Sequence, residues 1–145
     1  MNMYQVKVSY ERQADAMGMK KVTEVYLVDA MSFTEAEERI IKEIQPLVSI
    51  GELEVVGVKR VNLAELVLSH DDREDTYYRA KVSFLTFDEK SGQPRASAVN
   101  MLVQAETLQK AVGRLTEELE KQLGSYLINS VTETPILGVY LTEQS

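Results

Sequence analysis

The segment Tyr4-Gln-Val-Lys-Val-Ser-Tyr10 recurs later in the chain as Tyr78-Arg-Ala-Lys-Val-Ser-Phe84, and this recurrence decides the fold. The two segments share Tyr, Lys, Val and Ser under a shift of 74 residues, from 4 to 78. A shift of 75 residues, from 27 to 102, aligns further pairs: Leu27 with Leu102, Ser32 with Thr107, Ala36 with Ala111, and Arg39 with Arg114. Matches that keep the same order over a long stretch indicate an internal repeat. The sequence therefore predicts a tandem duplication.

The first copy is predicted to contain two strands, a helix and a third strand. Residues 3–11 alternate apolar and polar side chains with the two-residue period of a half-buried strand. A polar stretch over residues 12–20 separates it from a second strand over 21–30, which is rich in Val, Thr and Tyr. The sequence Ser32-Phe-Thr-Glu35 is a capping box that starts an amphipathic helix. A strand over residues 53–67 completes this copy.

The second copy repeats this order. Residues 77–87 and 95–105 predict a hairpin, and Gly92 supplies the positive φ that its turn needs. A helix follows, and a last strand covers residues 128–141. Pro135 lies inside that strand, which favours an edge position or a bulge because proline has no N–H to donate.

The predicted fold class is α+β. It is a tandem duplication of a strand–strand–helix–strand unit, with a mainly antiparallel sheet, two helices on one face and pseudo-twofold symmetry. The predicted repeats cover residues 1–69 and 77–145, and an acidic linker over residues 70–76 joins them. A unit of about 70 residues has little core of its own, so the two repeats are expected to pack as one domain.

Composition narrows the class of protein. The chain has 145 residues, no cysteine, and 16 basic against 23 acidic side chains, for a net charge of -7. The absence of cysteine excludes disulfide frameworks, thiolate metal sites and cysteine nucleophiles. The N-terminal residues do not resemble a signal peptide, and no apolar run is long enough to span a membrane. We therefore expect a cytoplasmic protein that is not bound to a membrane.

The chain offers few groups for catalysis or metal binding. His70 is the single histidine, and its place in the acidic linker favours a solvated loop residue over a catalytic base. The linker acids do not follow the ligand spacing of an EF-hand loop: they are Asp71, Asp72, Glu74 and Asp75. No glycine-rich phosphate loop is present in the sequence. The sequence thus predicts no enzyme activity, no cofactor and no metal site.

Candidate interface or ligand-binding residues are expected on the sheet face that points away from the helices. Five of them are apolar: Val25, Leu27, Leu85, Phe87 and Leu102. Three of them are basic: Lys7, Arg79 and Lys81. We expect the apolar residues to lie at a seam, where the two copies form one continuous sheet or stack as layers. A homodimer that uses the same face is the next possibility.

Two functions from different classes fit these residues. The first is a non-enzymatic interaction or assembly module that self-associates or docks a protein partner along its sheet. The alternative is a nucleic-acid-binding accessory protein, because basic residues on a sheet can contact phosphates. The alternative is the weaker one, since most strand aromatics are expected on the core side and the net charge is negative.

The most distinctive stretches of the chain are residues 20–37, 87–92, 101–105 and 130–137. Together they resemble an uncharacterised family, a domain of unknown function, found in Bacteroidetes and their phages or mobile elements. Gly138 departs from the family pattern, in which an aspartate often stands at this position. The resemblance implies a bacterial or phage-encoded cytoplasmic protein, and it brings no known activity, cofactor or catalytic residue.

Overall fold

The computed structural model describes residues 2–14 and 18–142 of the chain. They form two α-helices and two four-stranded sheets, each with parallel and antiparallel neighbours, so the α+β prediction is confirmed. The chain divides into two compact units. Unit 1 comprises Met1–Asn62 and Pro135–Ser145, and unit 2 comprises Leu63–Thr134.

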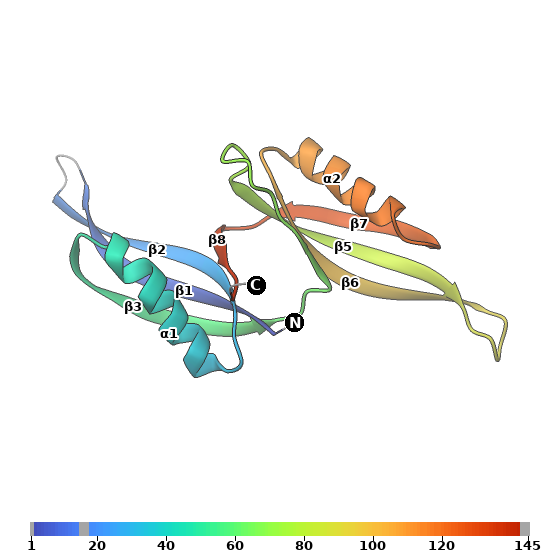
Figure 1. Ribbon diagram of the computed structural model, residues 1–145, viewed down its shortest axis with the longest axis horizontal. Coiled ribbons are helices and arrows are strands. Elements are labelled where there is room, and N and C mark those ends of the chain that lie inside the picture. The colour runs from blue at the N-terminus through green and yellow to red at the C-terminus, as the bar shows by residue number, and fades with distance from the viewer. Residues whose placement is uncertain (1, 15–17, 143–145) are drawn as a thin grey trace. The chain divides into compact units, whose positions relative to one another are not determined.

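Unit 1 is a sheet that carries one helix on one face (Figure 1). Its elements are β1 (Met3–Ala14), β2 (Gly18–Asp29), α1 (Phe33–Ile44), the short 3-10 helix η1 (Gln45–Leu47), β3 (Ile50–Val61) and β8 (Ile136–Tyr140). The strands lie in the order β3-β1-β2-β8. β1 is antiparallel to both β3 and β2, whereas β8 runs parallel to β2.

Unit 2 has the same arrangement (Figure 1). Its elements are β4 (Glu65–Val67), β5 (Thr76–Phe87), β6 (Pro94–Ala105), α2 (Leu108–Glu120) and β7 (Ser125–Glu133). The strands lie in the order β4-β6-β5-β7. Here β4 is the short parallel strand, and it lies beside β6.

Each unit has its own core between helix and sheet. In unit 1 the buried side chains include Tyr4, Val6 and Val8 on β1, with Ala36, Ile40 and Ile44 on α1. In unit 2 the equivalent side chains are Tyr78, Ala80 and Val82 on β5, with Ala111, Leu115 and Leu119 on α2. Steps of two along a strand and of three or four along a helix place these residues on one face of each element. The sequence pattern therefore predicted the helix-covered cores correctly.

The helix starts also agree with the sequence. The Ser32 hydroxyl accepts a hydrogen bond from the backbone N–H of Glu35 at 3.1 Å. The Thr107 hydroxyl accepts one from the N–H of Lys110 at 3.2 Å. Both are N-caps, which satisfy a backbone donor that the first helical turn leaves without a partner.

The fourth strand of each sheet belongs to the other sequence repeat. Strand β4 directly follows β3, but it pairs with β6 of unit 2, and β8 follows β7 but pairs with β2 of unit 1. The registers are equivalent, since Leu66 lies beside Leu102 and Val139 lies beside Leu27. The duplication therefore includes a fourth strand, and each repeat gives this strand to the other unit. We call β4 and β8 the exchanged strands.

Two strand predictions were wrong in length because of this exchange. The strand predicted over residues 53–67 is two strands, since β3 ends at Val61 and β4 lies in the other sheet. The strand predicted over residues 128–141 is likewise interrupted at Pro135, between β7 and β8. Proline cannot donate to the ladder, so the chain leaves the sheet there. A single continuous sheet is also wrong, because the eight strands form two separate sheets.

The predicted boundaries also differ from the observed ones. The polar stretch expected over residues 12–20 is mostly strand, because β1 continues to Ala14 and β2 begins at Gly18; residues 15–17 lie outside the described part. The compact units do not coincide with the sequence repeats over 1–69 and 77–145, since each unit takes one short strand from the other repeat.

Candidate interaction surface

Each sheet has a face that does not carry its helix, which we call the helix-free face. All eight candidate residues lie on it, because they alternate with residues that point to the helix-covered cores. The structure separates them by exposure. Three are buried and out of reach of an external partner: Val25, Leu27 and Leu102. Five are exposed: Lys7, Arg79, Lys81, Leu85 and Phe87.

The exposed apolar residues gather at the end of the β5–β6 hairpin, which extends beyond the end of α2 (Figure 1). Leu85 lies opposite Ala96, and Phe87 lies opposite Pro94. Leu127 belongs to the same face, because it pairs with Ser83 on the neighbouring strand. The exposed fractions are 45% for Leu85, 76% for Phe87 and 58% for Leu127. We call Leu85, Phe87, Pro94, Ala96 and Leu127 the arm patch.

The arm patch occurs in unit 2 and has no equivalent in unit 1, although the two units have the same fold. The equivalent positions of unit 1 follow from the two registers: Glu11 for Leu85, Gln13 for Phe87, Lys21 for Ala96, and Glu54 for Leu127. Among the equivalents only Met19, which stands for Pro94, is apolar. The same sheet therefore forms with a charged end in unit 1, so packing within the unit does not explain the apolar end of unit 2.

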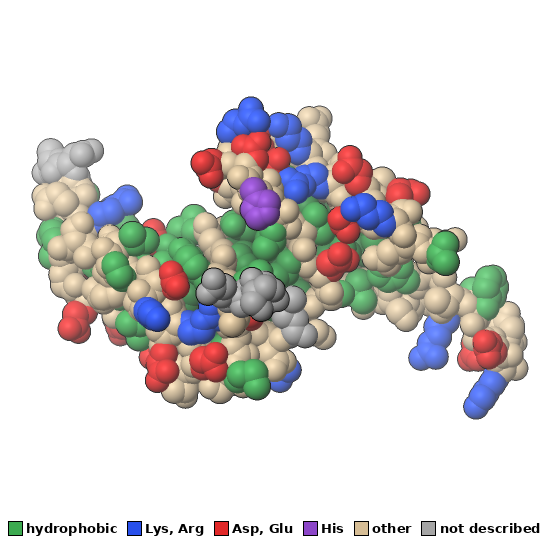
Figure 2. Space-filling model, viewed as in Figure 1, with side chains coloured by type: hydrophobic (Ala, Val, Ile, Leu, Met, Phe, Trp, Pro, Cys, Tyr) green, Lys and Arg blue, Asp and Glu red, His purple; other side chains and the backbone are tan. Residues whose placement is uncertain are grey.

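Charged residues flank the arm patch along β5. On the helix-free face, Arg79 and Lys81 lie toward the start of the strand, and both are exposed. Neither makes an ion pair with any residue that the structure describes. The turn after the strand holds Asp88, Glu89 and Lys90, and the Asp88 carboxylate accepts the N–H of Lys90 at 2.9 Å. Figure 2 shows hydrophobic and charged side chains close together at this end of the hairpin.

Two of the four edge strands, β3 and β7, are poor templates for another strand. β7 has a bulge where the register shifts between Lys81 and Val82, and β3 has the equivalent bulge beside Lys7 and Val8. Bulges bend an edge strand and interrupt its row of free donors and acceptors, which discourages pairing with another chain. The helix-free face is therefore a better surface for a partner than the edges of β3 and β7.

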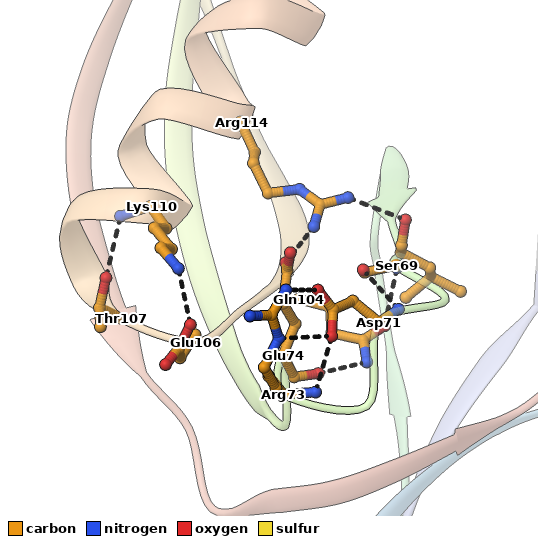
Figure 3. A network of polar contacts seen from close by, with 10 residues as sticks. Ser69, Asp71, Arg73, Glu74, Gln104, Glu106, Thr107, Lys110 and Arg114 are labelled. Carbon is orange, nitrogen blue, oxygen red and sulfur yellow. Dashed lines mark hydrogen bonds and ion pairs between the residues drawn. The ribbon is translucent and has the colours of Figure 1, made fainter.

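A polar network fixes the segment that follows β4 (Figure 3). Arg114 on α2 donates to the Glu74 carboxylate and, at 3.2 Å, to the carbonyl of Leu68. The Gln104 side chain accepts the N–H of Ser69 at 2.9 Å and donates to the Glu74 carbonyl at 2.6 Å. These bonds tie the connection between β4 and β5 to the body of unit 2. The acidic linker is thus held in place over part of its length.

Unit 1 has the equivalent network after β8. Arg39 donates to the Asp29 carboxylate at 2.5 Å and to the Thr142 hydroxyl at 3.3 Å. The Asp29 carboxylate also accepts the N–H of Thr142 at 2.6 Å. Burial raises the pKa of Asp29, but the hydrogen bonds from Arg39 and Thr142 outweigh it, and the pKa is lowered. In both units, a helix arginine therefore holds the segment that follows the exchanged strand.

Two of the linker acids, Asp71 and Glu74, pair with arginines of their own unit. The Arg73 side chain and backbone donate to Asp71 and lower the pKa of its carboxyl to about 2. The Glu74 carboxylate is bound by Arg114, and His70 is exposed. Residues 2–14 and 18–142 contain no group of three or more His, Cys, Asp or Glu that could hold a metal ion. No helix in the described part is long and apolar enough to cross a membrane.

Sequence reasoning missed three of the arm-patch residues and both arginine networks. Pro94 and Ala96 become neighbours of the predicted residues through the register between β5 and β6. Leu127 does so through the register between β5 and β7, which the β7 bulge shifts. The arginines did leave a signal, because Arg39 and Arg114 are identical in the aligned repeats. An identical charged residue at the aligned position of both helices suggests a shared contact, although it does not show which one.

A known protein family matches both repeats of this chain. A family model described as a domain of unknown function, DUF4494, matches residues 2–142. The chain belongs to the DUF4494 family. No curated protein and no solved structure matches it. Because the match spans both repeats, the DUF4494 domain comprises the whole two-unit structure with its exchanged strands.

The exchanged strand β4 of this DUF4494 domain carries a glutamate, Glu65, whose surroundings disfavour its charged form. Burial of Glu65 on β4 raises the pKa of its carboxyl, and the neighbouring Glu118 raises it further. Because the pKa of Glu65 is higher in the folded state, its contribution to the free energy of unfolding is complete below the unfolded-state pKa near 4.5. This contribution is lost as the pH rises through the folded-state pKa. We expect Glu65→Gln to stabilise unit 2 by about 0.5 kcal/mol at pH 7, in the range of charge contacts near a surface. Urea unfolding followed by circular dichroism measures this gain.

The gain from Glu65→Gln should disappear at pH 3.5, where the native glutamate is protonated in both states. Glu117→Gln is the matched control, because Glu117 is exposed on α2 and its substitution changes the net charge by the same amount. Equal effects of the two variants at pH 7 would show that only the net charge matters.

Proposed function

We propose that this DUF4494 protein is a non-enzymatic interaction module that binds a protein through the arm patch. The observation that supports this is the exposure of Leu85, Phe87 and Leu127 on one helix-free face. Contiguous exposed apolar residues rimmed by charges are typical of protein-binding surfaces. The charged equivalents in unit 1 indicate that the fold does not require this exposure.

Phe87 is the natural anchor of such a contact. It is the most exposed large side chain of the arm patch, and an aromatic ring gives a large apolar area at low cost in side-chain entropy. Arg79 and Lys81 lie on the same face beyond Leu85, where they would form part of a polar rim. This arrangement of an apolar centre and a charged rim resembles an ordinary protein interface.

Nucleic acid fits this surface less well. Within the described residues, Phe87 is the one exposed aromatic side chain on either helix-free face, so successive bases would lack a row of rings to stack on. The net charge of -7 also opposes binding to a polyanion. The two basic residues on β5 are too few to offset this.

A photocrosslinking amino acid at position 87 tests the proposal in cells that naturally make the protein. We expect adducts with one discrete protein, which is either this chain or another, and their loss in a Leu85→Glu background. The matched control carries the same crosslinker at Gln13, the equivalent position in unit 1. Adducts with nucleic acid at position 87, or equal protein adducts at both positions, would contradict the proposal.

A further inference from the structure

We infer that the helix-free face of unit 2 binds an acidic, extended segment of a partner protein, whose carboxylates pair with Arg79 and Lys81. This inference rests on the proposed function, because it names the chemistry of the partner that binds there. It follows from the charges on this face, from their recurrence in unit 1, and from their place on the same strand as Leu85 and Phe87.

The helix-free face of unit 2 is basic, although the chain as a whole is acidic. Strands β5, β6 and β7 contain a single acidic residue, Glu133, and it lies on the helix-covered side because it pairs with Tyr78. Arg79 and Lys81 are the charged residues that these strands place on the helix-free face, and both are exposed. The other exposed polar side chains of this face are hydroxyls and amides, such as Ser130. A segment bound to this face therefore meets positive charge and no negative charge from these three strands.

Unit 1 carries a basic pair at the equivalent positions of its own helix-free face. Lys7 is the equivalent of Lys81, and both are exposed. The second basic residue recurs in the same cross-strand pair but on the other strand: the pairs are Arg79 with Thr132 in unit 2 and Gln5 with Lys59 in unit 1. None of the four basic residues makes an ion pair with a residue that the structure describes. Like charges that lie close together repel each other, so their recurrence through different residues favours a role in binding an anionic group.

The basic and apolar residues of unit 2 lie in one row along β5. Arg79 and Lys81 come first, and Leu85 and Phe87 follow on the same face. The row spans about 27 Å, which an extended segment of about nine residues matches. Side chains on one face of such a segment also recur at every second residue. Two acidic side chains can therefore meet the basic pair while an apolar side chain further along meets the arm patch.

A polypeptide fits this row better than a nucleic acid does. A polypeptide can place carboxylates at one end and an apolar side chain at the other, whereas phosphates would continue over Leu85 and Phe87. Ions screen charges over about 8 Å at physiological ionic strength, so a bound segment responds to this face more than to the acids of α2 on the other side of the sheet. Unit 2 is the stronger site, because the face of unit 1 also holds Glu11 and Glu54.

Selection from a displayed library of random peptides of about 12 residues, on the purified full chain, tests this inference, because such peptides can cover the whole row. We expect the enriched peptides to contain at least a pair of acidic residues followed or preceded by an aliphatic or aromatic one. Enriched peptides that are no more acidic than the starting library would overturn the inference, and so would a library from which nothing is enriched.

Substitution of the basic pair tests the site with one labelled, enriched peptide. Arg79→Ser combined with Lys81→Ser should weaken its binding about 3- to 30-fold in fluorescence anisotropy, in the range of two exposed charge contacts. The matched control combines Lys90→Ser with Arg95→Ser, which removes the same charge from the turn and from the other side of the sheet. Equal weakening by the two double variants would show that the peptide responds to net charge alone.

Charge exchange tests direct pairing. Arg79→Glu combined with Lys81→Glu should abolish binding of the acidic peptide and permit binding of a version with lysine in place of each acidic residue. Failure of the lysine version to bind would overturn the paired contacts. Single-stranded DNA that displaces the peptide at equal charge would overturn the polypeptide as the ligand.

The crosslinker at position 87 separates this inference from the proposed function. If that position captures a protein while the library yields no acidic peptide, the proposed function survives and the acidic segment is overturned. If acidic peptides bind through Arg79 and Lys81 with the same affinity in a Leu85→Glu background, the basic pair is confirmed as a binding site and the arm patch is overturned as part of it.

Discussion

A chain that ends at Thr134 is expected to lose the folded sheet of unit 1 while unit 2 stays folded. The deletion removes β8, which pairs with residues 25–28 of β2 and buries Ile136. It also removes the backbone N–H of Thr142 that Asp29 accepts. The lost ladder bonds contribute about 1 kcal/mol each and the burial of Ile136 about 1.5–3 kcal/mol. A unit of this size has a net stability of only about 3–5 kcal/mol, so the loss is comparable with the whole.

Hydrogen exchange followed by mass spectrometry measures this result. Amides of β1 and β2 should exchange rapidly in the shortened chain, whereas those of β5 and β7 should keep their protection. A chain that ends at Thr142 is the control, because it keeps β8 and the contact with Asp29. Normal protection of β2 without β8 would show that the exchanged strand is not needed for the sheet.

Leu115→Ala is expected to destabilise unit 2 by about 2–5 kcal/mol. Leu115 is fully buried on α2, between the helix and the strands of its sheet. Truncation removes buried methyl groups and leaves a cavity that the rigid neighbours fill only in part. Ile40 is the equivalent residue of α1, so Ile40→Ala should have a similar effect on unit 1. Because each unit has a separate core, each substitution should act mainly on its own unit.

Urea unfolding gives the size of these effects, and hydrogen exchange shows which unit opens. Leu123→Ala is the control, because the Leu123 side chain is fully exposed after α2 and its removal should change stability by less than about 0.5 kcal/mol. Equal loss of protection in both units of either core variant would show that the units unfold as one cooperative body.

The sequence predicted what depends on periodicity and local capping. Alternation placed Tyr4 and Tyr78 under the helices, and hydroxyls at Ser32 and Thr107 marked the helix starts. The exchanged strands escaped prediction because three to five residues are too short to show a period. Their partner is also set by pairing far along the chain, which no local pattern records. Pro135 was the one local clue, and it marks the break between β7 and β8.

The candidate surface was predicted in part for a similar reason. Alternation assigns a face to each strand residue, and all eight candidates do lie on the helix-free faces. Alternation does not predict burial on that face, so it could not separate the buried Leu27 and Leu102 from the exposed Leu85 and Phe87. The register of β7, which brings Leu127 to the same face, depends on a bulge that no local sequence pattern predicts.

The exchange of strands also sets an order of events on the ribosome. Unit 1 has its first three strands once residue 61 has been synthesised, but its fourth strand ends at residue 140. At about 5–20 residues per second, the intervening 79 residues take roughly 4–16 s. During this interval the edge of β2 has no partner from its own chain, and Leu27 lies on that edge. Until β8 has been made, this edge is open to pairing with a strand of another chain.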